Sequence, residues 1–482
     1  MVLWIWAKGS TFVPFMTTGI MEQETSKRWR AMGEGASLVP FALFVVSAIG
    51  LSFFGAVDVD LLVAVGIGAV LVGTFLANDA ETYWSTVFEY MGSKTAMTAT
   101  LLWLVVGVYG MVLREGRIVE GLVWAADWLH IGGGMFTVVV FLFSGLFAVS
   151  TGSGFGTISA MSLTLFPAGV ALGGEPVWLG GAILSGAALG DSVAPVSDTA
   201  VIAATTQEYS NGKGVADIGG TVKARLPFVV MAVAASVTVF LAAGIGLTEV
   251  SQGVGQHTVE GNPRGLALLV PTLVVIGLSF RRVNIFVALA VGLVLAVVIG
   301  LSLGLFEVKS LVGIEGGTVS GAVVNGIRGM ASICILLMVV VSLSGLIIRS
   351  GCMERMIGRL NRRVIRSKRS AELTIFSLVS LAGILIAAVN TIANICVAPF
   401  VNSIGREHGL HPHRRATLLA TVICTFPFIL PYGGCVLLLL RGVEASGCGV
   451  PLRATDLFWA AVYPWTLWVV MLAACIMKKR EG

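Results

Sequence analysis

Charged residues are scarce in this chain of 482 residues, because Asp, Glu, Lys and Arg together make up only 12% of it. A soluble globular protein carries roughly 25% charged residues, since polar groups must cover its surface. The low charge therefore excludes a soluble fold of this size. With 56% hydrophobic residues and a mean hydropathy of +0.93, the composition also excludes an intrinsically disordered chain.

The usual signatures of enzymes and metal sites are also missing. The sequence contains no HExxH or Walker-type motif, and its GxSxG match, GLSLG at 300–304, lies within the long apolar run 283–305; these are the local patterns of zinc proteases, nucleotide-binding loops and hydrolases. Its 7 cysteines all lie in the second half without a CxxC pair, so we expect small apolar packing residues rather than a disulfide framework or a metal centre. We therefore expect neither an enzyme nor a resident cofactor.

What the sequence does contain is a series of apolar runs, most of them roughly 20 residues long, enough to cross a bilayer. The clearest runs are 35–54, 57–77, 96–113, 131–149, 177–205, 228–248, 265–280, 283–305, 330–349, 371–389, 415–440 and 455–476. They are continuous rather than alternating in period two, which excludes a membrane β-barrel. We predict an all-α polytopic membrane protein with about 11–12 transmembrane helices.

The formal net charge of +5 does not indicate nucleic-acid binding. Its largest source is a cluster between two apolar runs that consists of Arg349, Arg355, Arg359, Arg362, Arg363, Arg366, Lys368 and Arg369. Such a cluster is typical of a cytoplasmic loop. We expect an integral protein of a bacterial-type cytoplasmic (inner) membrane, with the lipid bilayer as its partner, and leave a homo-oligomer open. For His408, His411 and His413 we expect a solvated loop rather than a metal site.

The two halves of the sequence share features in the same order. The pattern G-x-x-x-R-x-G ends an apolar run at 110–116 and ends another at 345–351. Paired broken segments in duplicated halves are typical of secondary transporters. The predicted segments are an N-terminal stretch at 1–34, a first transmembrane repeat at 35–250 and a second transmembrane repeat at 265–476.

Two stretches, 150–170 and 389–405, are too polar at their start for a lipid-facing helix. Irregular backbone at membrane depth survives only where protein or a water-filled cavity surrounds it, so we predict a re-entrant hairpin at each. The alternative is helix packing through small residues. The candidate substrate or ion contacts are Thr151, Gly152, Ser153 and Thr157 in the first hairpin and Asn390, Thr391 and Asn394 in the second.

The sharpest feature is the stretch GDSVAPVSDT at 190–199, inside the run 177–205, which we predict to be a broken helix. Asp191 and Asp198 are the only charged residues of that run. An isolated carboxylate at the bilayer centre costs about 2.5–3.5 kcal/mol, which a bound cation, a proton or a polar partner must offset. The candidate ion or proton ligands are Asp191, Asp198, Ser192, Ser197 and Thr199.

These oxygens suit a small hard cation, and we expect Na⁺ at Asp191 and Asp198. The alternative is that the two aspartates cap helix ends inside the bundle. Capping accounts for one of them but not for two acids in an otherwise uncharged run. The second predicted broken helix, 415–440, contains no acid at all, so the negative charge of an ion site would come from the first half.

The sequence resembles the NhaC-type sodium/proton antiporters of the ion transporter superfamily. The family carries a stretch like GD-x-x-SPLSDT, which stands here at 190–199, and a hairpin like TGTSWGT, which stands here as TGSGFGT at 151–157. The similarity extends loosely from about residue 35 to 440. It implies two inverted repeats whose re-entrant hairpins and broken helices meet near the midplane. The second half departs from the family, which usually has an acidic stretch where 415–430 has none.

We therefore expect a secondary antiporter that exchanges Na⁺ for H⁺, in which Asp191 and Asp198 alternate between protonated and Na⁺-bound states. The alternative is Na⁺-coupled transport or exchange of a small organic anion or amino acid, held by the hairpin tips. A membrane-embedded enzyme or a passive channel fits less well, because no nucleophile–base pair is visible and the duplication favours alternating access.

Overall fold

The protein is helical throughout the part of the chain that its computed structural model describes. The described residues are 32–477 except 34, 54–58, 196, 210–213, 247–259, 282, 316–317, 352–364, 366 and 388–389. Most of the predicted N-terminal stretch and of the arginine-rich cluster therefore lies outside them. Two short antiparallel strands, β1 (Gly313–Glu315) and β2 (Thr318–Ser320), are the only β-sheet among the described residues.

The chain falls into two series of helices. The first series comprises α2 (Leu38–Phe53), α3 (Val59–Leu76), α4 (Ala80–Met91), α5 (Lys94–Glu115), α6 (Ile118–Trp128), α7 (Gly133–Thr151), α8 (Gly154–Ala171), α9 (Pro176–Val193), α10 (Asp198–Thr205) and α11 (Ile218–Gly246). The second comprises η2 (Pro263–Leu268), α12 (Leu269–Phe280), α13 (Ile285–Ser302), α14 (Val308–Leu311), α15 (Ala322–Arg349), α17 (Lys368–Leu385), α18 (Asn390–Glu407), α19 (Pro412–Ile423), η3 (Phe426–Phe428), α20 (Gly434–Ala445), α21 (Ala454–Ala460) and α22 (Val462–Ile476).

The polytopic helical class predicted from the sequence is confirmed. Within the described residues 8 helices are long and apolar enough to cross a membrane, or 9 when the bent pair α21 and α22 counts as one span. This is fewer than the 11–12 expected. The helices α2 and α12 have only 16 and 12 residues, and α19 and α20 have 12 residues each on either side of their break. Helix α17 carries three charged residues, Lys368, Arg369 and Glu372.

Helix boundaries recur along the chain at a constant spacing. Four helices of the second series each begin at the same distance in sequence after a helix of the first series. The matched pairs begin at 154 and 390 (α8 and α18), 176 and 412 (α9 and α19), 198 and 434 (α10 and α20), and 218 and 454 (α11 and α21). The two sequence motifs at 110–116 and 345–351 have nearly the same separation. The outer limits of the two repeats stay a prediction.

Both predicted broken helices are present, with slightly different ends. The first is α9 followed by α10, interrupted between Val193 and Asp198, and the second is α19 followed by α20, interrupted between Ile423 and Gly434. In each pair the leading helix begins with a proline at its first position, Pro176 or Pro412, where the missing N–H is no loss. A third break, at Ala461, bends α21 and α22 by 50°, and the sequence did not indicate it.

The hairpin boundaries need correction. Residues 154–171 form the single helix α8, so the hairpin is made by α7 and α8 together and turns at Gly152. Gly152 has φ +67°, a left-handed conformation that favours glycine. Likewise α18 runs unbroken from Asn390 to Glu407 and pairs with α17. The polar residues that suggested whole hairpins at 150–170 and 389–405 mark only the tips.

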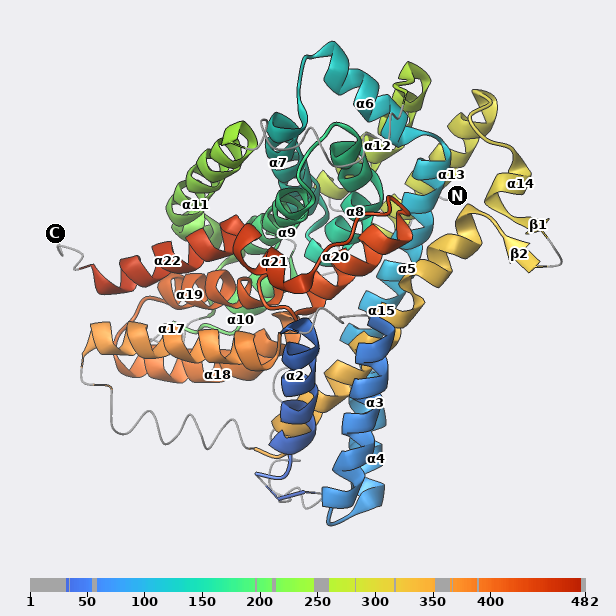
Figure 1. The fold of residues 1–482 in the computed structure, drawn as a ribbon. Helices are drawn as coiled ribbons and strands as arrows, with labels where there is room; N and C mark the ends of the chain where they lie inside the picture. Colours follow the sequence, from blue (N-terminus) through green and yellow to red (C-terminus); the bar gives the residue numbers. More distant parts are fainter. Residues whose placement is uncertain are drawn as a thin grey trace, which may run out of the picture.

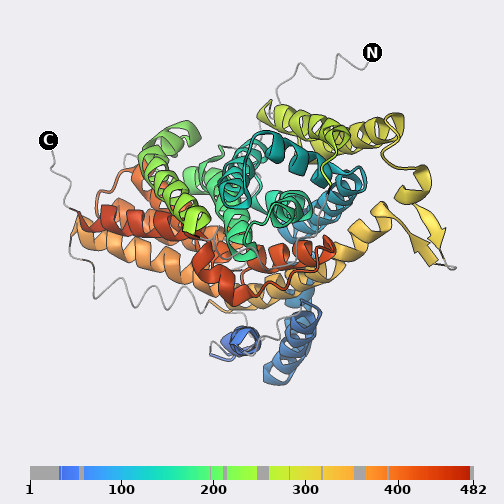
Figure 2. The same cartoon turned by 45° about the horizontal axis from the view of Figure 1, so that its top comes forward.

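The helix that carries the aspartate motif lies at the centre of the molecule (Figure 1). It is α9, which packs against α7 and α8 on one side and against α21 and α22 on the other. Helices α17, α18, α19 and α22 lie together beside this group, and α2, α3 and α4 extend from the opposite end along α15 (Figures 1 and 2). The second half of each broken helix packs against the other series, since α10 contacts α18 and α19 and α20 contacts α8.

Candidate ion site at the first broken helix

Asp191 lies in the last turn of α9, with only 6% of its surface exposed. Its Oδ1 accepts a hydrogen bond of 2.8 Å from the backbone N–H of Gly154, and its Oδ2 accepts one of 3.2 Å from Nδ2 of Asn390. Gly154 is the first residue of α8 and Asn390 the first residue of α18. The carboxylate therefore meets the N-terminal ends of two helices, where the helix dipoles favour negative charge.

Gly154 allows this close approach because it has no side chain. A Cβ at this position would lie 2.8 Å from Oδ2 of Asp191 and 3.0 Å from Cζ of Phe428. Both distances are below normal van der Waals contact. The glycine at the tip of the first hairpin therefore permits the close contact between the start of α8 and the carboxylate of α9.

Thr199 connects the two halves of the broken helix. Its Oγ1 donates to the backbone carbonyl of Asp191 at 3.0 Å and lies 2.9 Å from Oγ of Ser197. Its own carbonyl accepts a bond of 2.9 Å from Nδ2 of Asn394. The thiol of Cys424, at the end of α19, lies 3.5 Å from Thr199 Oγ1. Side chains from both series of helices therefore contact the break between α9 and α10.

Two amide oxygens at this site have no hydrogen-bond donor. They are Oδ1 of Asn390 and Oδ1 of Asn394, both on α18 and both fully enclosed by protein. A buried polar atom without a partner costs about 1–3 kcal/mol. One carboxylate and two free amide oxygens form a set of hard ligands suited to a cation that takes oxygen ligands.

The other predicted residues are not all brought to this site. The Ser192 hydroxyl lies 2.7 Å from the hydroxyl of Tyr463 in α22. Asp198, the first residue of α10, is exposed. It lies within electrostatic range of Asp191 and of Lys94. The expectation that both aspartates bind one ion stays a prediction, and in this structure only Asp191 is held in the buried cluster, while Asp198 is exposed.

The hydroxyl groups of the first hairpin are bonded locally. Thr151 Oγ1 donates to the carbonyl of Phe147 at 2.9 Å. Ser153 caps α8 by accepting from the N–H of Gly156, and Thr157 donates to the carbonyl of Ser153. In the second hairpin, Thr391 is half-buried in the first turn of α18. In this conformation the first hairpin contributes its backbone to the site and the second contributes its side chains.

Sequence reasoning missed one charged residue near this cluster, Arg225 of α11. Its side chain is fully buried, with 0% of the residue exposed, and Nε, Nη1 and Nη2 have no hydrogen-bond partner among the described residues. It lies within electrostatic range of Cys424 and Tyr463. The apolar run in the sequence begins only at 228, whereas α11 begins at Ile218 and continues through Pro227. The arginine therefore lies two turns inside a helix rather than in a loop.

A second group of polar residues lies at the start of α19, away from the aspartate cluster. Nε2 of His413 lies 2.9 Å from Oδ1 of Asp217. Arg414 forms a bidentate ion pair with Glu372. The Gly220 N–H and the His413 ring hold the pKa of Asp217 below its usual value. Among the described residues, no group of three or more His, Cys, Asp or Glu side chains is placed to hold a metal.

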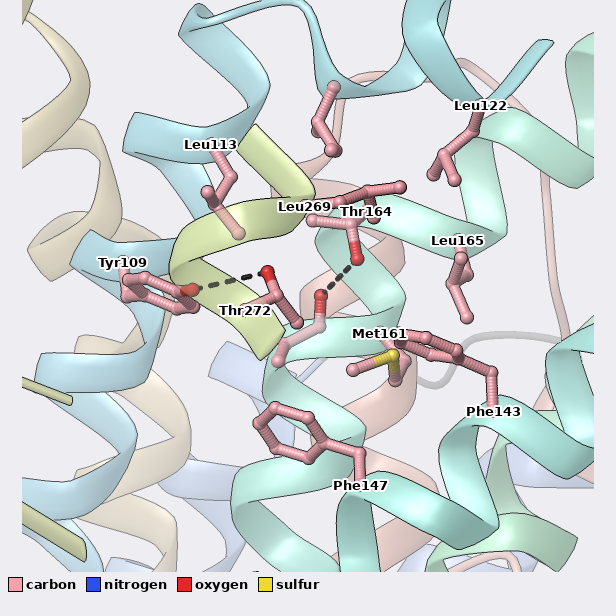
Figure 3. Close-up of a pocket in the computed structure, with 12 residues that line it drawn as sticks. Tyr109, Leu113, Leu122, Phe143, Phe147, Met161, Thr164, Leu165, Leu269 and Thr272 are labelled. Atoms are coloured by element: carbon pink, nitrogen blue, oxygen red, sulfur yellow. Dashed lines mark hydrogen bonds between the residues drawn. The ribbon is translucent and has the colours of Figure 1, made fainter. Parts of the chain in front are cut away.

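An apolar pocket lies between α5, α6, α7, α8 and α12. Figure 3 shows its two polar contacts, from Tyr109 to Thr272 across helices and from Thr164 to the carbonyl of Ala160 within α8. The rest of the lining is aliphatic, aromatic or methionine. Asp191 is not part of this pocket, so the apolar cavity and the polar cluster are separate features.

Comparisons with known proteins place these features in a family. A model of the Na⁺/H⁺ antiporter family matches residues 208–477, which include α18 and its two asparagines but not Asp191. A malate-2H⁺/Na⁺-lactate antiporter of Bacillus subtilis (strain 168) is 26% identical over 167 residues, which cover 34% of this chain and 35% of that relative. The match thus spans about a third of the relative's length.

A solved structure is also similar in outline. The YdaH transporter of Alcanivorax borkumensis aligns over 91% of this chain and 97% of its own, with 14% identity and a TM-score of 0.42. The assignment to a family rests instead on the family model, which matches more than half of the sequence. This helical membrane protein therefore belongs to the Na⁺/H⁺ antiporter family.

Proposed function

We propose that this protein is a secondary antiporter that exchanges Na⁺ for H⁺ at the cluster around Asp191. The observations that carry the proposal are the buried carboxylate of Asp191, which accepts a hydrogen bond from the Asn390 amide, and two buried amide oxygens of α18 that have no donor among the described residues. Such a set is costly when empty and is relieved by a bound cation. The family match over residues 208–477 supports cation exchange as the activity.

The mechanism needs only one titratable group. Asp191 accepts either a proton or Na⁺, and the two compete because one carboxylate cannot bind both. When Na⁺ is bound, the oxygens of Asn390 and Asn394 complete its shell, and when Na⁺ leaves, a proton neutralises the buried acid. Exchange then follows if the site opens alternately to the two sides of the membrane, as paired broken helices in secondary transporters allow.

Asp198 takes a different role in this proposal. Its exposed carboxylate lies within electrostatic range of Asp191, so it attracts cations toward the buried site without binding them there. The location that we propose is a bacterial-type cytoplasmic membrane. The support for that location is the arginine-rich sequence between 349 and 369, which the positive-inside rule places in the cytoplasm.

Proteoliposomes that contain a pH-sensitive dye test the proposed exchange. We expect Na⁺ alone to dissipate an imposed pH gradient with the wild-type protein. The Asp191→Asn variant should insert and fold but fail to respond, because the amide cannot release a proton. Asp127→Asn, at the exposed end of α6, is the matched control and should behave like the wild type. A Na⁺ response that survives in Asp191→Asn would refute the proposed ion site.

A second candidate function is Na⁺-coupled transport or exchange of a small organic anion or amino acid. The name of the B. subtilis relative, which specifies malate and lactate, supports it over the matched third of the chain. It ranks second because the family description names Na⁺ and H⁺. In the same vesicles this function predicts no response to Na⁺ until the organic solute is added.

A further inference from the structure

The most unusual charged side chain among the described residues is Arg225. It lies seven residues into α11, a helix that is apolar enough over Ile218–Gly244 to span a membrane. The side chain is fully buried, and within the part of the chain that the structure describes none of its three guanidinium nitrogens has a hydrogen-bond partner. Arginine stays protonated in proteins, so a full positive charge is enclosed without a bonded counter-charge. An unpaired buried charge is among the costliest arrangements in a protein.

Two neighbouring arginines show how this fold normally treats buried guanidinium groups. Arg415 is equally buried, but it donates to the backbone carbonyls of Asn402 and Glu208. Arg414 forms two hydrogen bonds to the carboxylate of Glu372. Both therefore have acceptors within the fold. Arg225 differs from them because none of its guanidinium nitrogens has an acceptor among the described residues.

The surroundings of Arg225 connect it to the proposed ion site. The guanidinium is within electrostatic range of Cys424, at the end of α19, and of Tyr463, in the first turn of α22. Cys424 is in turn within range of Asp191 and touches Thr199 and Asn390. Helix α11, which carries Arg225, packs against α9, α10, α19 and α22, and these helices surround the Asp191 cluster.

We propose that the guanidinium of Arg225 binds the carboxylate of a small organic anion next to the cation site at Asp191. A carboxylate fits because the planar guanidinium presents parallel N–H donors that match its two oxygens. Full burial favours a small anion, since each additional group must also be enclosed. The inference rests on the proposal that the Asp191 cluster is the transport site, and it adds an anionic ligand to the cation there.

Binding measurements on the purified full-length protein test this inference. Choline salts of acetate, lactate, succinate and malate are the probes, because choline keeps Na⁺ out of the experiment. Choline chloride is the comparison for a simple halide site. The readout is the melting temperature followed by tryptophan fluorescence, for which the chain has 11 tryptophans. Titration of each salt then gives a dissociation constant.

We expect at least one carboxylate to stabilise the wild-type protein more than chloride at the same concentration. Arg225→Gln should weaken its binding about tenfold to a hundredfold, the effect of losing hydrogen bonds to a charged group. Arg225→Lys should bind with intermediate affinity, since an ammonium keeps the charge but not the paired donors. The matched control is Arg415→Gln, which removes an equally buried arginine that has protein partners and should leave carboxylate affinity within about threefold.

The outcomes separate this inference from the proposed function. If no carboxylate binds the wild type while Na⁺ still raises its melting temperature, the anion site is wrong and the cation site stands. If carboxylates bind in an Arg225-dependent way but Na⁺ has no effect, the cation site is wrong. Equal stabilisation by chloride, or unchanged carboxylate binding in Arg225→Gln, overturns the anion site. Should Arg225→Gln not fold, the wild-type titrations and Arg225→Lys decide the question.

Discussion

The two broken helices of this protein have the same layout but opposite chemistry. In the first, α9 and α10 carry two acids, whereas α19 and α20 enclose a break without any acid. The constant spacing between matched helix starts pairs Asp191 with Pro427, so the counterpart of the buried carboxylate is a proline in η3. The same spacing pairs Gly154 with Asn390, and both of these bind Asp191.

The two series of helices share one framework but form a single asymmetric polar cluster. The equivalent helix starts of α8 and α18 approach the same carboxylate, one with a backbone N–H and the other with a side-chain amide. Because the second half supplies only neutral ligands, one negative charge remains at the centre. A single carboxylate that bears either a proton or a Na⁺ ion is sufficient for competitive exchange.

The largest effect should come from filling the space at Gly154. In Gly154→Ala the new methyl group would lie 2.8 Å from Oδ2 of Asp191 and 3.0 Å from Phe428. We expect loss of more than about 90% of Na⁺-dependent transport and a destabilisation of about 1–3 kcal/mol, as in overpacked interiors. Transport and melting temperature measured on the same samples check this.

Gly132→Ala is the control for Gly154→Ala. Gly132 precedes α7, and a Cβ there would meet nothing within 4 Å. This variant should transport at the wild-type rate. Wild-type transport by Gly154→Ala would show that the contact between α8 and Asp191 is dispensable.

A smaller effect is expected at the free amide oxygens of α18. Asn390→Ala and Asn394→Ala each remove one proposed Na⁺ ligand, and we expect the apparent Na⁺ affinity to fall about tenfold in each, the cost of one lost bond to a charged group. Initial rates of Na⁺-driven pH change at a series of Na⁺ concentrations measure this. Thr391→Ala, in the same turn of α18, is the control, and equal effects in all three variants would contradict the assignment of the ligands.

A still smaller effect is expected at the second acid of the first break. Because Asp198 is exposed, Asp198→Asn should lower the apparent Na⁺ affinity only about twofold to threefold at low salt, as a screened surface charge does. The difference from the wild type should shrink as choline chloride is added. A loss as large as that of Asp191→Asn would show that Asp198 binds the ion directly.

The smallest effect concerns the polar contact between Asp217 and His413, outside the aspartate cluster. The pKa of Asp217 is held below its ordinary value of 3.8, first by the Gly220 N–H. The contact therefore adds stability above that ordinary pKa and loses it as the pH falls through the lower folded value. We expect Asp217→Asn to lower the melting temperature slightly at pH 7, and the difference from the wild type to shrink as the pH falls below 3.8. A pH series of melting curves checks this, and a difference that persists at low pH would contradict it.

The sequence was sufficient to single out the residues that meet in the buried cluster around Asp191. Asp191 stood out because a carboxylate inside an uncharged apolar run needs a specific reason. Asn390 and Asn394 stood out for the same kind of reason, as polar residues at the start of a buried segment. The helical class and the two broken helices also followed from apolar runs interrupted by proline and polar residues.

Other features could not be derived from composition and spacing. The exposure of Asp198 depends on how α10 is rotated relative to α9, which no local pattern specifies. The contact between Ser192 and Tyr463 joins residues 271 positions apart. Arg225 was overlooked because Pro227 and the preceding charges are typical of a loop, whereas tertiary packing extends α11 through them.

The central claim is that Na⁺ and a proton compete for Asp191. The most direct measurement is proton release on adding NaCl to the purified protein in a weakly buffered solution with a pH indicator, with choline chloride as the blank. We predict that Na⁺ releases protons from the wild type near neutral pH and releases none from Asp191→Asn. Na⁺ binding by the wild type without proton release, or equal release from Asp191→Asn, would contradict the account.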